Sequence, residues 1–352
     1  MSDNLKAAQQ HLLHLIREHD GFLPFEKYME QALYHVDYGY YANSIANVGA
    51  AGDFSTSATV SPLLGRAIVS WVRERHRELA LGRKWHLIEV GGGNGLLAKR
   101  VLHELGWLQR LGCQYHIVEV SPRLRQLQED ALERYSIQWH SHLGEAIQSA
   151  GGKALIISNE LIDAFPVQCF LYEEGQWREV GLIEEKGIIS EASRMRLSDR
   201  ADYTYQSLSE IWPDGKEGLR YEVAYEVAEW LKEWSTALHC GSVLTIDYGD
   251  EQEPLLRQFP FGSLRAYYQH IPLEGDELYR RFGRQDITCE VNFTLLQRWA
   301  EEAGLRTVGT QNQKEFILQR LGNKAIVNVG DEMMISSAGA GAAFKVTEWV
   351  KP

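Results

Sequence analysis

Cysteine is scarce in this sequence of 352 residues. The cysteines lie about 50 to 70 residues apart, and the chain has neither a Cys-x-x-Cys pair nor a His-Glu-x-x-His motif. This spacing argues against a disulfide framework and against structural zinc. The twelve histidines show no metal-ligand spacing either, so the sequence predicts no metal site. Four cysteines are expected to be reduced core residues: Cys113, Cys169, Cys240 and Cys289.

Long apolar runs are also absent. The longest span about six to eight residues, whereas a helix that crosses a bilayer needs roughly 20. Residues 1–20 have the pattern of an amphipathic helix, without the apolar core of a signal peptide or the Arg-rich pattern of a transit peptide. We therefore expect a cytoplasmic protein with no membrane partner.

Basic residues are outnumbered, because 36 Lys and Arg face 48 Asp and Glu, for a formal net charge of −12. Such a chain repels a phosphate backbone, and it offers no long basic run, which argues against a nucleic-acid partner. Basic or neutral partners fit this charge better. The hydrophobic share of 44% is that of an ordinary folded protein.

Short apolar runs alternate with helical patterns from residue 85 onward. Strands are expected at 85–90, 115–120, 137–140, 154–158 and 242–246, and helices at 96–105, 122–131 and 221–238. This alternation is typical of an α/β protein with a doubly wound, Rossmann-like parallel sheet. A helix at 293–303 and strands at 305–310 and 344–350 would complete the sheet, with a tight turn at 338–343.

The length of the chain favours one large domain with insertions or two domains that share a core. The alternation is lost in two segments, at about 166–220, which starts with an expected hairpin, and at about 250–290, which is too long for a simple connection. We expect both to be insertions on the substrate side of a catalytic core over 81–352. Residues 1–80 are expected to form an N-terminal helical and loop segment that contributes to the active site.

The strongest local motif is IEVGGGNG, which follows the first expected strand. Without Cβ atoms, Gly91, Gly93 and Gly95 let the backbone turn sharply and approach a ligand. A dinucleotide-binding loop needs glycine at the position of Leu96, so a pyrophosphate is disfavoured. A cofactor without phosphate, S-adenosylmethionine, fits the spacing, with Glu89 facing its cationic methionine portion. The alternative is a tight strand-to-helix turn with no ligand.

Polar residues follow the next strands. Glu119 ends the second strand, where its carboxylate can accept hydrogen bonds from both ribose hydroxyls. The alternative for Glu119 considered alone is a solvated acid at a strand end. Asn159, Glu160 and Asp163 follow the fourth strand, and ligands of open α/β sheets bind outside the carboxyl ends of strands. These three are therefore candidate catalytic residues. A helix cap by Asp163 and a turn closed by Asn159 are the alternatives.

A loop before the core contains Gly52, Asp53, Phe54 and Thr56. Small polar and aromatic residues of this kind can close over a ligand. The alternative is a turn in which Asp53 caps a helix.

In the order of these motifs the chain resembles the MidA family, which includes the mitochondrial complex I assembly methyltransferase and bacterial relatives. The resemblance covers roughly residues 20–350. The motifs that carry it are Ala32 to Tyr34, Gly39 to Tyr41, Gly52 to Phe54 with Thr56, Glu89 to Gly95, Val118-Glu119 with Ser121-Pro122, Asn159-Glu160 with Asp163-Ala164 and Pro166, Ile246 to Gly249, Gly262 to Ala266, and Asp286 to Thr288 with Val291 and Phe293.

The resemblance implies a class I methyltransferase fold, S-adenosyl-L-methionine as donor and S-adenosyl-L-homocysteine as product. It places the loop from Gly52 to Thr56 among the cofactor-binding residues. From the mitochondrial members it also implies a protein arginine side chain as acceptor. Glu160 and Asp163 would then pair with the guanidinium, and Asp247, after the fifth strand, is a weaker candidate for the same surface.

The chain departs from the family pattern at four positions. Gly92 and Asn94 replace a proline-like and a basic residue of the glycine loop, and both still permit its turn. Asn292 stands in place of an aspartate, and Ala58 in place of a proline. These changes bear on the acceptor more than on the donor.

Two rival functions remain open on the sequence. One is a nicotinamide-dependent oxidoreductase on the same fold. The other is a non-catalytic assembly or scaffold protein that retains a donor-binding pocket. The two insertions can form a homodimer surface, a peptide groove or both.

Overall fold

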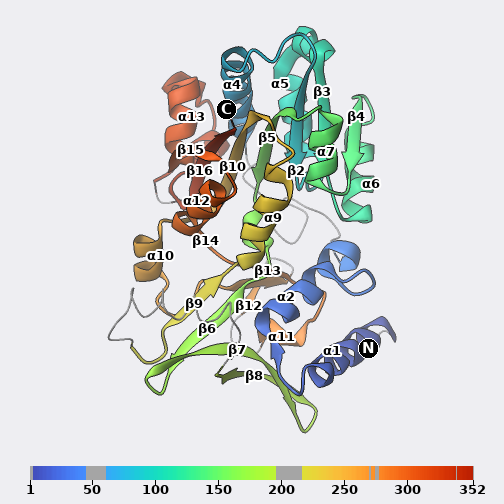
Figure 1. Cartoon of the computed structure of the whole chain (residues 1–352), viewed down its shortest axis with the longest axis vertical. Helices are drawn as coiled ribbons and strands as arrows, with labels where there is room; N and C mark the ends of the chain where they lie inside the picture. The colour runs from blue at the N-terminus through green and yellow to red at the C-terminus, as the bar shows by residue number, and fades with distance from the viewer. Residues whose placement is uncertain are drawn as a thin grey trace. The chain divides into compact units, whose positions relative to one another are not determined.

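The computed structural model describes residues 3–44, 61–195, 216–268, 271–273, 277–337 and 339–351 (Figure 1). Two compact units make up the chain. Unit 1 consists of Met1–Ile45, Ala164–Glu226 and Gln252–Glu290. Unit 2 consists of Ala46–Asp163, Val227–Glu251 and Val291–Pro352.

Unit 2 contains an eight-stranded sheet in the order β15-β16-β10-β5-β2-β3-β4, with β14 beside the end of β10. Its strands are β2 (Trp85–Val90), β3 (Cys113–Val118), β4 (Ile137–His140), β5 (Lys153–Asn159), β10 (Cys240–Asp250), β14 (Val291–Asn292), β15 (Arg306–Asn312) and β16 (Phe344–Lys351). Strands β10, β5, β2, β3 and β4 are parallel neighbours, and β16 is antiparallel to both β10 and β15. This is the expected doubly wound α/β sheet.

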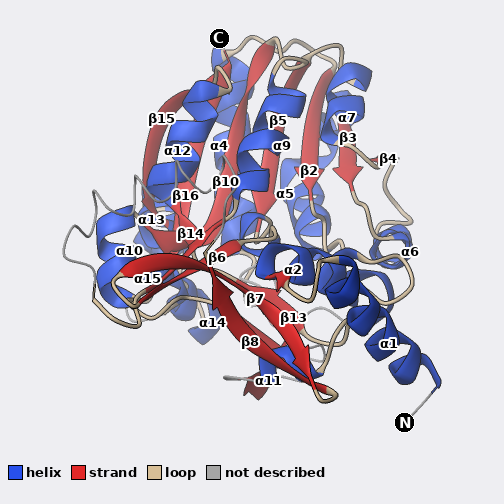
Figure 2. Cartoon of the chain, turned by 60° about the horizontal axis from the view of Figure 1, so that its bottom comes forward, coloured by secondary structure: helices blue, strands red, loops and turns tan. Residues whose placement is uncertain are grey.

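The central strands of this sheet are buried on both faces, which explains their almost continuous apolar sequences. Helices lie on both faces of the sheet (Figure 2). The α-helices of unit 2 are α4 (Leu63–Glu78), α5 (Leu96–Gly112), α6 (Pro122–Ala131), α7 (Leu143–Ser149), α9 (Tyr225–Ser235, from its third residue), α12 (Phe293–Glu302), α13 (Gln313–Leu321), α14 (Val329–Met334) and α15 (Ala340–Ala343). Two 3₁₀ turns are η2 (Ile162–Ala164), whose last residue belongs to unit 1, and η3 (Asn323–Ala325).

The main core of unit 2 lies on one face of the sheet. Because side chains alternate along a strand, every second residue of β2, β3, β5 and β10 packs against α4, α5 and α13. Leu87 and Leu155 lie in this core, with Trp71 of α4 fully buried beside them. This packing holds the carboxyl ends of the parallel strands at one edge of the sheet.

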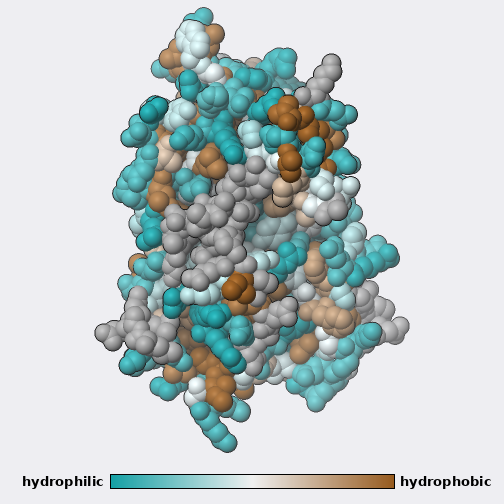
Figure 3. Space-filling view, turned by 180° about the vertical axis from the view of Figure 1, so that it is seen from behind, coloured by the Kyte–Doolittle hydropathy of each residue, from teal (hydrophilic) through white to brown (hydrophobic). Residues whose placement is uncertain are grey.

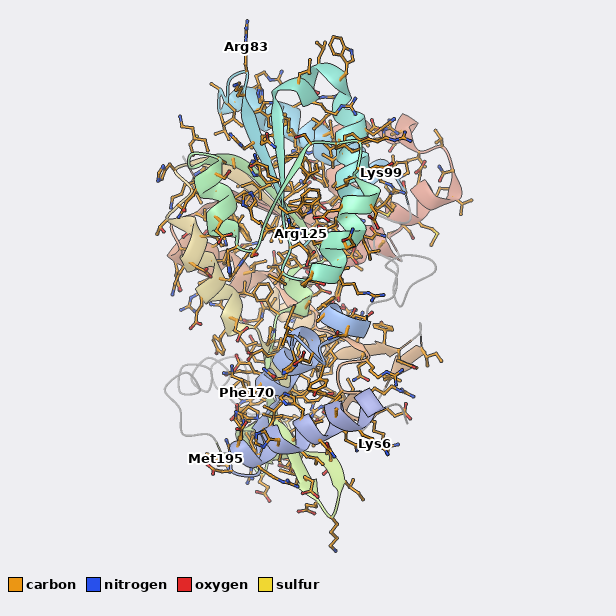
Figure 4. The ribbon with its side chains drawn as sticks, turned by 90° about the vertical axis from the view of Figure 1, so that its right-hand side faces the viewer. Lys6, Arg83, Lys99, Arg125, Phe170 and Met195 are labelled. Atoms are coloured by element: carbon orange, nitrogen blue, oxygen red, sulfur yellow. The ribbon has the colours of Figure 1, made fainter. Side chains whose placement is uncertain are left out.

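Unit 1 contains two antiparallel sheets. The first has the order β1-β7-β6-β9, with β8 also pairing with β7, and the second has the order β12-β11-β13. Their strands are β1 (Leu23–Pro24), β6 (Gln168–Glu173), β7 (Gln176–Glu185), β8 (Ile188–Arg194), β9 (Arg220–Val223), β11 (Arg265–Tyr268), β12 (Ile271–Leu273) and β13 (Asp286–Thr288). The β6–β7 hairpin confirms the hairpin that the sequence predicts at the start of the segment at about 166–220. Phe170 of β6 lies among the packed side chains of this unit, whereas Arg83 of unit 2 projects outward (Figure 4).

Among its described residues, unit 1 also contains four short or amphipathic helices and one π-helical turn. They are α1 (Asp3–Glu18), α2 (Phe25–Tyr34), α10 (Gln252–Gln258), α11 (Glu277–Arg280) and the π-helix η1 (Tyr40–Ser44). No helix of the described ranges combines the length and the hydropathy needed to cross a membrane. The face drawn in Figure 3 is largely hydrophilic, with small hydrophobic patches between polar side chains.

Several elements differ from the sequence-based predictions. The helix expected at 221–238 starts later, because Arg220–Val223 alternate in burial and pair with β6 as strand β9. The turn expected at 338–343 contains the short helix α15. Strand β3 ends at Val118, two residues before the expected end, and the helices α13 and α14 were not predicted.

Candidate active site

The glycine loop joins β2 to α5 at the carboxyl end of β2. Gly91 and Gly93 have φ values of 71° and 53°, in the left-handed region that favours glycine. A Cβ atom on Gly91 would lie 2.9 Å from Leu161 Cδ1, whereas one on Gly93 would meet no atom within 4 Å. The loop therefore packs closely against Leu161 at Gly91 and leaves open space beside Gly93. A ligand that binds to the loop backbone needs such a space.

Glu89, the last acid of β2, is a buried carboxylate. The hydroxyl of Tyr115 donates a hydrogen bond to its Oε2. Burial raises the pKa of Glu89 to about 7, the Tyr115 bond opposes this, and the charge of Glu119 adds to it. In the part of the chain that the structure describes, no ion pair includes Glu89. A cationic ligand group nearby would stabilise its ionised form.

Glu119 follows β3 and is also buried. Its Oε1 accepts a hydrogen bond from the Ser121 backbone N–H at 2.9 Å, and its Oε2 accepts one from Gln128 Nε2 at 2.9 Å. Its own N–H donates to the His140 carbonyl oxygen at 3.0 Å. Burial raises the pKa of Glu119 to about 7, and the donors from Ser121 and Gln128 oppose this. The carboxylate is thus held in one orientation at the edge of the sheet.

Gln128 of α6 is a site residue that the sequence reasoning missed. It is fully buried, and its Nε2 donates to both Glu119 Oε2 and the Gly93 carbonyl oxygen, each at 2.9 Å. Its Oε1 accepts a hydrogen bond from Trp139 Nε1 at 3.1 Å. The signal was present: Gln128 lies four residues after the buried Leu124, so it is a polar residue on the apolar face of an amphipathic helix.

Asn159 and Glu160 lie where β5 ends. Asn159 Nδ2 donates a hydrogen bond to Glu160 Oε1 at 2.9 Å. Glu160 has φ 54°, which is uncommon for a residue with a side chain, and its N–H donates to the Ile246 carbonyl oxygen at 2.9 Å. Strained backbone of this kind clusters at functional sites, because the surrounding structure must hold it in place.

Asp247 of β10 organises the turn that follows Glu160. Its Oδ2 accepts hydrogen bonds from the backbone N–H groups of Leu161, Ile162 and Asp163 at 3.1, 2.8 and 3.3 Å. Its Oδ1 accepts one from the Tyr248 N–H at 3.0 Å. Both oxygens of the Asp247 carboxylate thus accept backbone N–H groups, and the acceptor contact considered from the sequence stays a prediction.

The predicted residues that the structure describes all come from one edge of the unit 2 sheet. Strands β10, β5, β2 and β3 are neighbours, so the residues that follow them lie at the same edge. These residues are Glu89, Gly91, Gly93, Gly95, Glu119, Asn159, Glu160 and Asp163. Gly52, Asp53, Phe54 and Thr56 lie outside the described residues. Among those described, no group of three or more His, Cys, Asp or Glu side chains is arranged to hold a metal ion.

Residues 63–311 match the family model Methyltransf_28, described as "Putative S-adenosyl-L-methionine-dependent methyltransferase". The "Protein arginine methyltransferase NDUFAF7 homolog, mitochondrial" of Drosophila melanogaster is 27% identical over 92% of this chain and 80% of its own length. The "Protein arginine methyltransferase NDUFAF7, mitochondrial" of Danio rerio is 26% identical over 84% of this chain and 72% of its own length.

A solved structure is similar over the whole fold. It is a COG1565 superfamily member from Burkholderia thailandensis, crystallised with S-adenosyl-homocysteine. It superposes on this chain with a TM-score of 0.87 and is 26% identical in sequence. The match covers 99% of this chain and 94% of the Burkholderia chain. A native structure of a COG1565 superfamily protein from the same organism superposes with a TM-score of 0.83. The resemblance and the fold class expected from the motifs are confirmed by these matches.

Proposed function

Because the chain belongs to the Methyltransf_28 family of S-adenosyl-L-methionine-dependent methyltransferases, we propose that its acceptor is a guanidinium nitrogen of an arginine side chain in a protein. The donor is S-adenosyl-L-methionine and the product is S-adenosyl-L-homocysteine. The relatives that are named protein arginine methyltransferases support this acceptor. The observation that carries it in this chain is the placement of two carboxylates, Glu160 and Asp163, directly after β5.

The donor side of the site has a distinct role for each group. Gly91, Gly93 and Gly95 bring the loop backbone close to the donor. Glu89 faces the cationic methionine portion, and Glu119 accepts hydrogen bonds from the ribose hydroxyls. The open side of Gly93 and the two buried carboxylates support this assignment. Gly52, Asp53, Phe54 and Thr56 are proposed to complete the donor site.

The acceptor side consists of Asn159, Glu160 and Asp163. The sulfonium of the bound donor supplies an electrophilic methyl group, whose bond to sulfur breaks as its bond to the acceptor nitrogen forms. Glu160 and Asp163 bind the guanidinium through charge-assisted hydrogen bonds and orient one nitrogen toward the methyl carbon. Glu160 accepts the proton that this nitrogen loses. Asn159 holds Glu160 through its 2.9 Å hydrogen bond.

Positioning is the main contribution of the protein to this reaction. Correct alignment of two reactants can supply about 7–11 kcal/mol of the barrier reduction. The Asp247 carboxylate fixes the backbone that carries Asp163, and Gln128 fixes Glu119. Both contacts keep the reacting groups in place before the acceptor arrives.

The net charge of −12 supports a basic protein acceptor in place of a nucleic acid. The segments at about 166–220 and 250–290 are proposed to contribute to acceptor binding or to a homodimer surface, and residues 1–80 to contribute to the active site. The cytoplasmic location and the lack of a membrane partner stay predictions, while the curated relatives are named as mitochondrial.

The test is incubation with S-adenosyl-L-methionine that carries a labelled methyl group and with a protein extract, followed by acid hydrolysis of the labelled proteins. The wild type is expected to produce labelled methylarginine. A Glu160→Gln variant is expected to bind S-adenosyl-L-homocysteine normally and to lose most of the transfer. Label on lysine, or label released from the intact proteins by base as methanol, as a methyl ester would give, would overturn the arginine acceptor. Donor binding without transfer to any protein would favour a non-catalytic assembly or scaffold role.

A further inference from the structure

Gln128 connects two parts of the donor site that come from different segments of the chain. The glycine loop follows β2, and Glu119 follows β3. We infer that Gln128 is a positioning residue, which fixes Gly93 and Glu119 relative to each other and thereby determines how tightly the donor is bound. This inference rests on the donor of the family and is independent of the proposed arginine acceptor.

The hydrogen bonds of Gln128 determine the orientation of its amide. Gln128 Nε2 donates one hydrogen bond to the Gly93 carbonyl oxygen and one to Glu119 Oε2, with a donor–acceptor distance of 2.9 Å in each. The Oε1 atom accepts from Trp139 Nε1 at 3.1 Å. A flipped amide would place three acceptor oxygens together and would set its NH₂ group against the indole N–H. The side chain therefore has one satisfied orientation, and it is fully buried in that orientation.

The glycine loop is shaped to rest on this side chain. A Cβ atom on Gly92 would lie 3.2 Å from Gln128 Nε2 and 3.1 Å from Ile117 Cγ2. A Cβ atom on Gly95 would lie 3.3 Å from Gln128 Cα. All three distances are tighter than ordinary van der Waals contact. The glycine at position 92 thus allows close approach of the loop to Gln128.

The edge strand β4 supports the same arrangement through two adjacent residues. Trp139 orients the Gln128 amide, and the carbonyl oxygen of His140 accepts the N–H of Glu119 at 3.0 Å. The Arg125 guanidinium lies 5.8 Å from the centroid of the Trp139 ring. Strand β4 therefore holds the backbone of Glu119 directly, through His140. It holds the side chain of Glu119 indirectly, through Trp139 and Gln128.

The charge state of Glu119 distinguishes a positioning role of Gln128 from a purely structural one. If Gln128 only packed in the interior, its replacement would not change the pKa of Glu119. Its pKa is raised by burial to about 7 and is lowered by its N–H donors, among them Gln128. The titratable and charged groups that face this region are Glu89 of β2, Tyr115 of β3, His140 of β4, Arg125 of α6 and Glu145 of α7. Loss of the Gln128 donor is expected to raise the pKa of Glu119 further, so that less of it is ionised at neutral pH.

The experiment is isothermal titration with S-adenosyl-L-homocysteine between pH 6 and pH 9, a range chosen around the pKa of about 7. Gln128→Met keeps the side-chain length and removes the amide. We expect it to bind about ten- to a hundredfold more weakly at pH 7, because it loses a hydrogen bond to a charged group, and to recover part of the affinity as the pH rises. The matched control is Gln313→Met, at another fully buried glutamine whose amide atoms have no hydrogen-bond partner among the described residues. It should bind as the wild type does.

Two further variants keep the inference testable if Gln128→Met folds poorly. Gln128→Glu places a second carboxylate beside Glu119, so its affinity should fall as the pH rises, opposite to the trend of Gln128→Met. Trp139→Phe removes only the indole N–H that orients the amide, and we expect about a three- to tenfold loss. Wild-type affinity and an unchanged pH profile in Gln128→Met, or in Trp139→Phe if the former does not fold, would overturn the inference.

Two further outcomes distinguish an error in the donor from an error in the acceptor. Failure of the wild type to bind S-adenosyl-L-homocysteine would contradict the donor, and failure to methylate arginine would contradict the acceptor alone. Equal losses in Gln128→Met and Gln313→Met at every pH would identify a general packing effect and would also overturn the positioning role.

Discussion

The hydroxyl of Tyr248 donates a hydrogen bond to Oδ2 of Asp163. Tyr248 lies near the carboxyl end of β10, and Asp163 lies in the turn that follows the neighbouring strand β5. The residue before Tyr248, Asp247, accepts the backbone N–H of Asp163 at 3.3 Å. Two adjacent residues of one strand therefore hold both the backbone and the side chain of a candidate catalytic residue that comes from the next strand.

Replacement of Tyr248 by phenylalanine should affect turnover more than donor binding. The variant retains the edge-to-face contact of this ring with Phe344 and loses only the hydroxyl that holds Asp163. We expect kcat for methyl transfer to fall about ten- to a hundredfold, since a hydrogen bond to a charged group is lost. Affinity for S-adenosyl-L-homocysteine should be nearly unchanged. A parallel loss of donor affinity would contradict a role confined to the acceptor side.

Asp247→Ala should lower the stability of the fold. Without the carboxylate, the N–H groups of Leu161, Ile162 and Asp163 lose their acceptor in a buried place. The expected loss is about 3 kcal/mol in the free energy of unfolding, measured by urea denaturation. The control is Asp130→Ala, whose exposed carboxylate accepts a surface hydrogen bond from Gln126; its effect should stay within about 0.5 kcal/mol. An unchanged midpoint in Asp247→Ala would show that the turn does not depend on this carboxylate.

A row of three histidines should make stability depend on pH. His116 is linked to His86 at 2.9 Å and to His140 at 3.0 Å between ring nitrogens. Burial, with smaller effects of the two neighbouring histidines, lowers the pKa of His116 to about 4. Burial also lowers the pKa of His140, an effect that Glu145 opposes and Arg125 reinforces. The unfolded chain, with an ordinary histidine pKa near 6.5, binds more protons over this range. The contribution of His116 to stability should therefore be fully present above about pH 6.5 and be lost as the pH drops toward 4.

The measurement is the free energy of unfolding at pH 7 and at pH 5 for the wild type and for His116→Gln. The wild type should lose about 1–2 kcal/mol more than the variant between these two values. His103→Gln, at a largely exposed histidine, should behave like the wild type. Equal pH dependence in His116→Gln and the wild type would exclude the buried histidine as the source.

Gly93→Val should abolish donor binding without unfolding the protein. The left-handed backbone at Gly93 disfavours a β-branched residue, and its side chain would enter the open space beside the loop. Gly151→Val is a matched control, because Gly151 has φ 64° and also meets no atom within 4 Å of an added Cβ. Titration with S-adenosyl-L-homocysteine should detect no binding to Gly93→Val and normal binding to Gly151→Val. Loss of binding in both would indicate backbone strain in general.

The sheet of unit 2 could be predicted closely from the sequence. The strand expected at 137–140 has the same bounds in the structure, and so does the strand at 85–90. Both segments are short and are followed by turn-forming residues, so local pattern and final structure agree. The strand at 220–223 was harder to predict, because it depends on pairing with β6, which is distant in the sequence.

The candidate site could be predicted only in part, for a related reason. Glycine spacing and acids at strand ends are local signals, and they led to Gly93, Glu119 and Glu160. Gln128 acts through contacts with residues 35 positions before and 11 after it in the chain, so nothing in its immediate neighbourhood marks it except its place on an apolar helix face. The commitment of the Asp247 carboxylate to a neighbouring turn is likewise visible only after folding.

The donor site is tested most directly by isothermal titration of S-adenosyl-L-homocysteine into the wild type and into Glu119→Ala. We expect micromolar binding to the wild type and loss of that binding in the variant, which removes the buried carboxylate between Ser121 and Gln128. Circular dichroism and thermal unfolding of both proteins would establish that the variant is folded. No binding to the wild type, or equal binding to both proteins, would contradict the donor site described for this sheet edge.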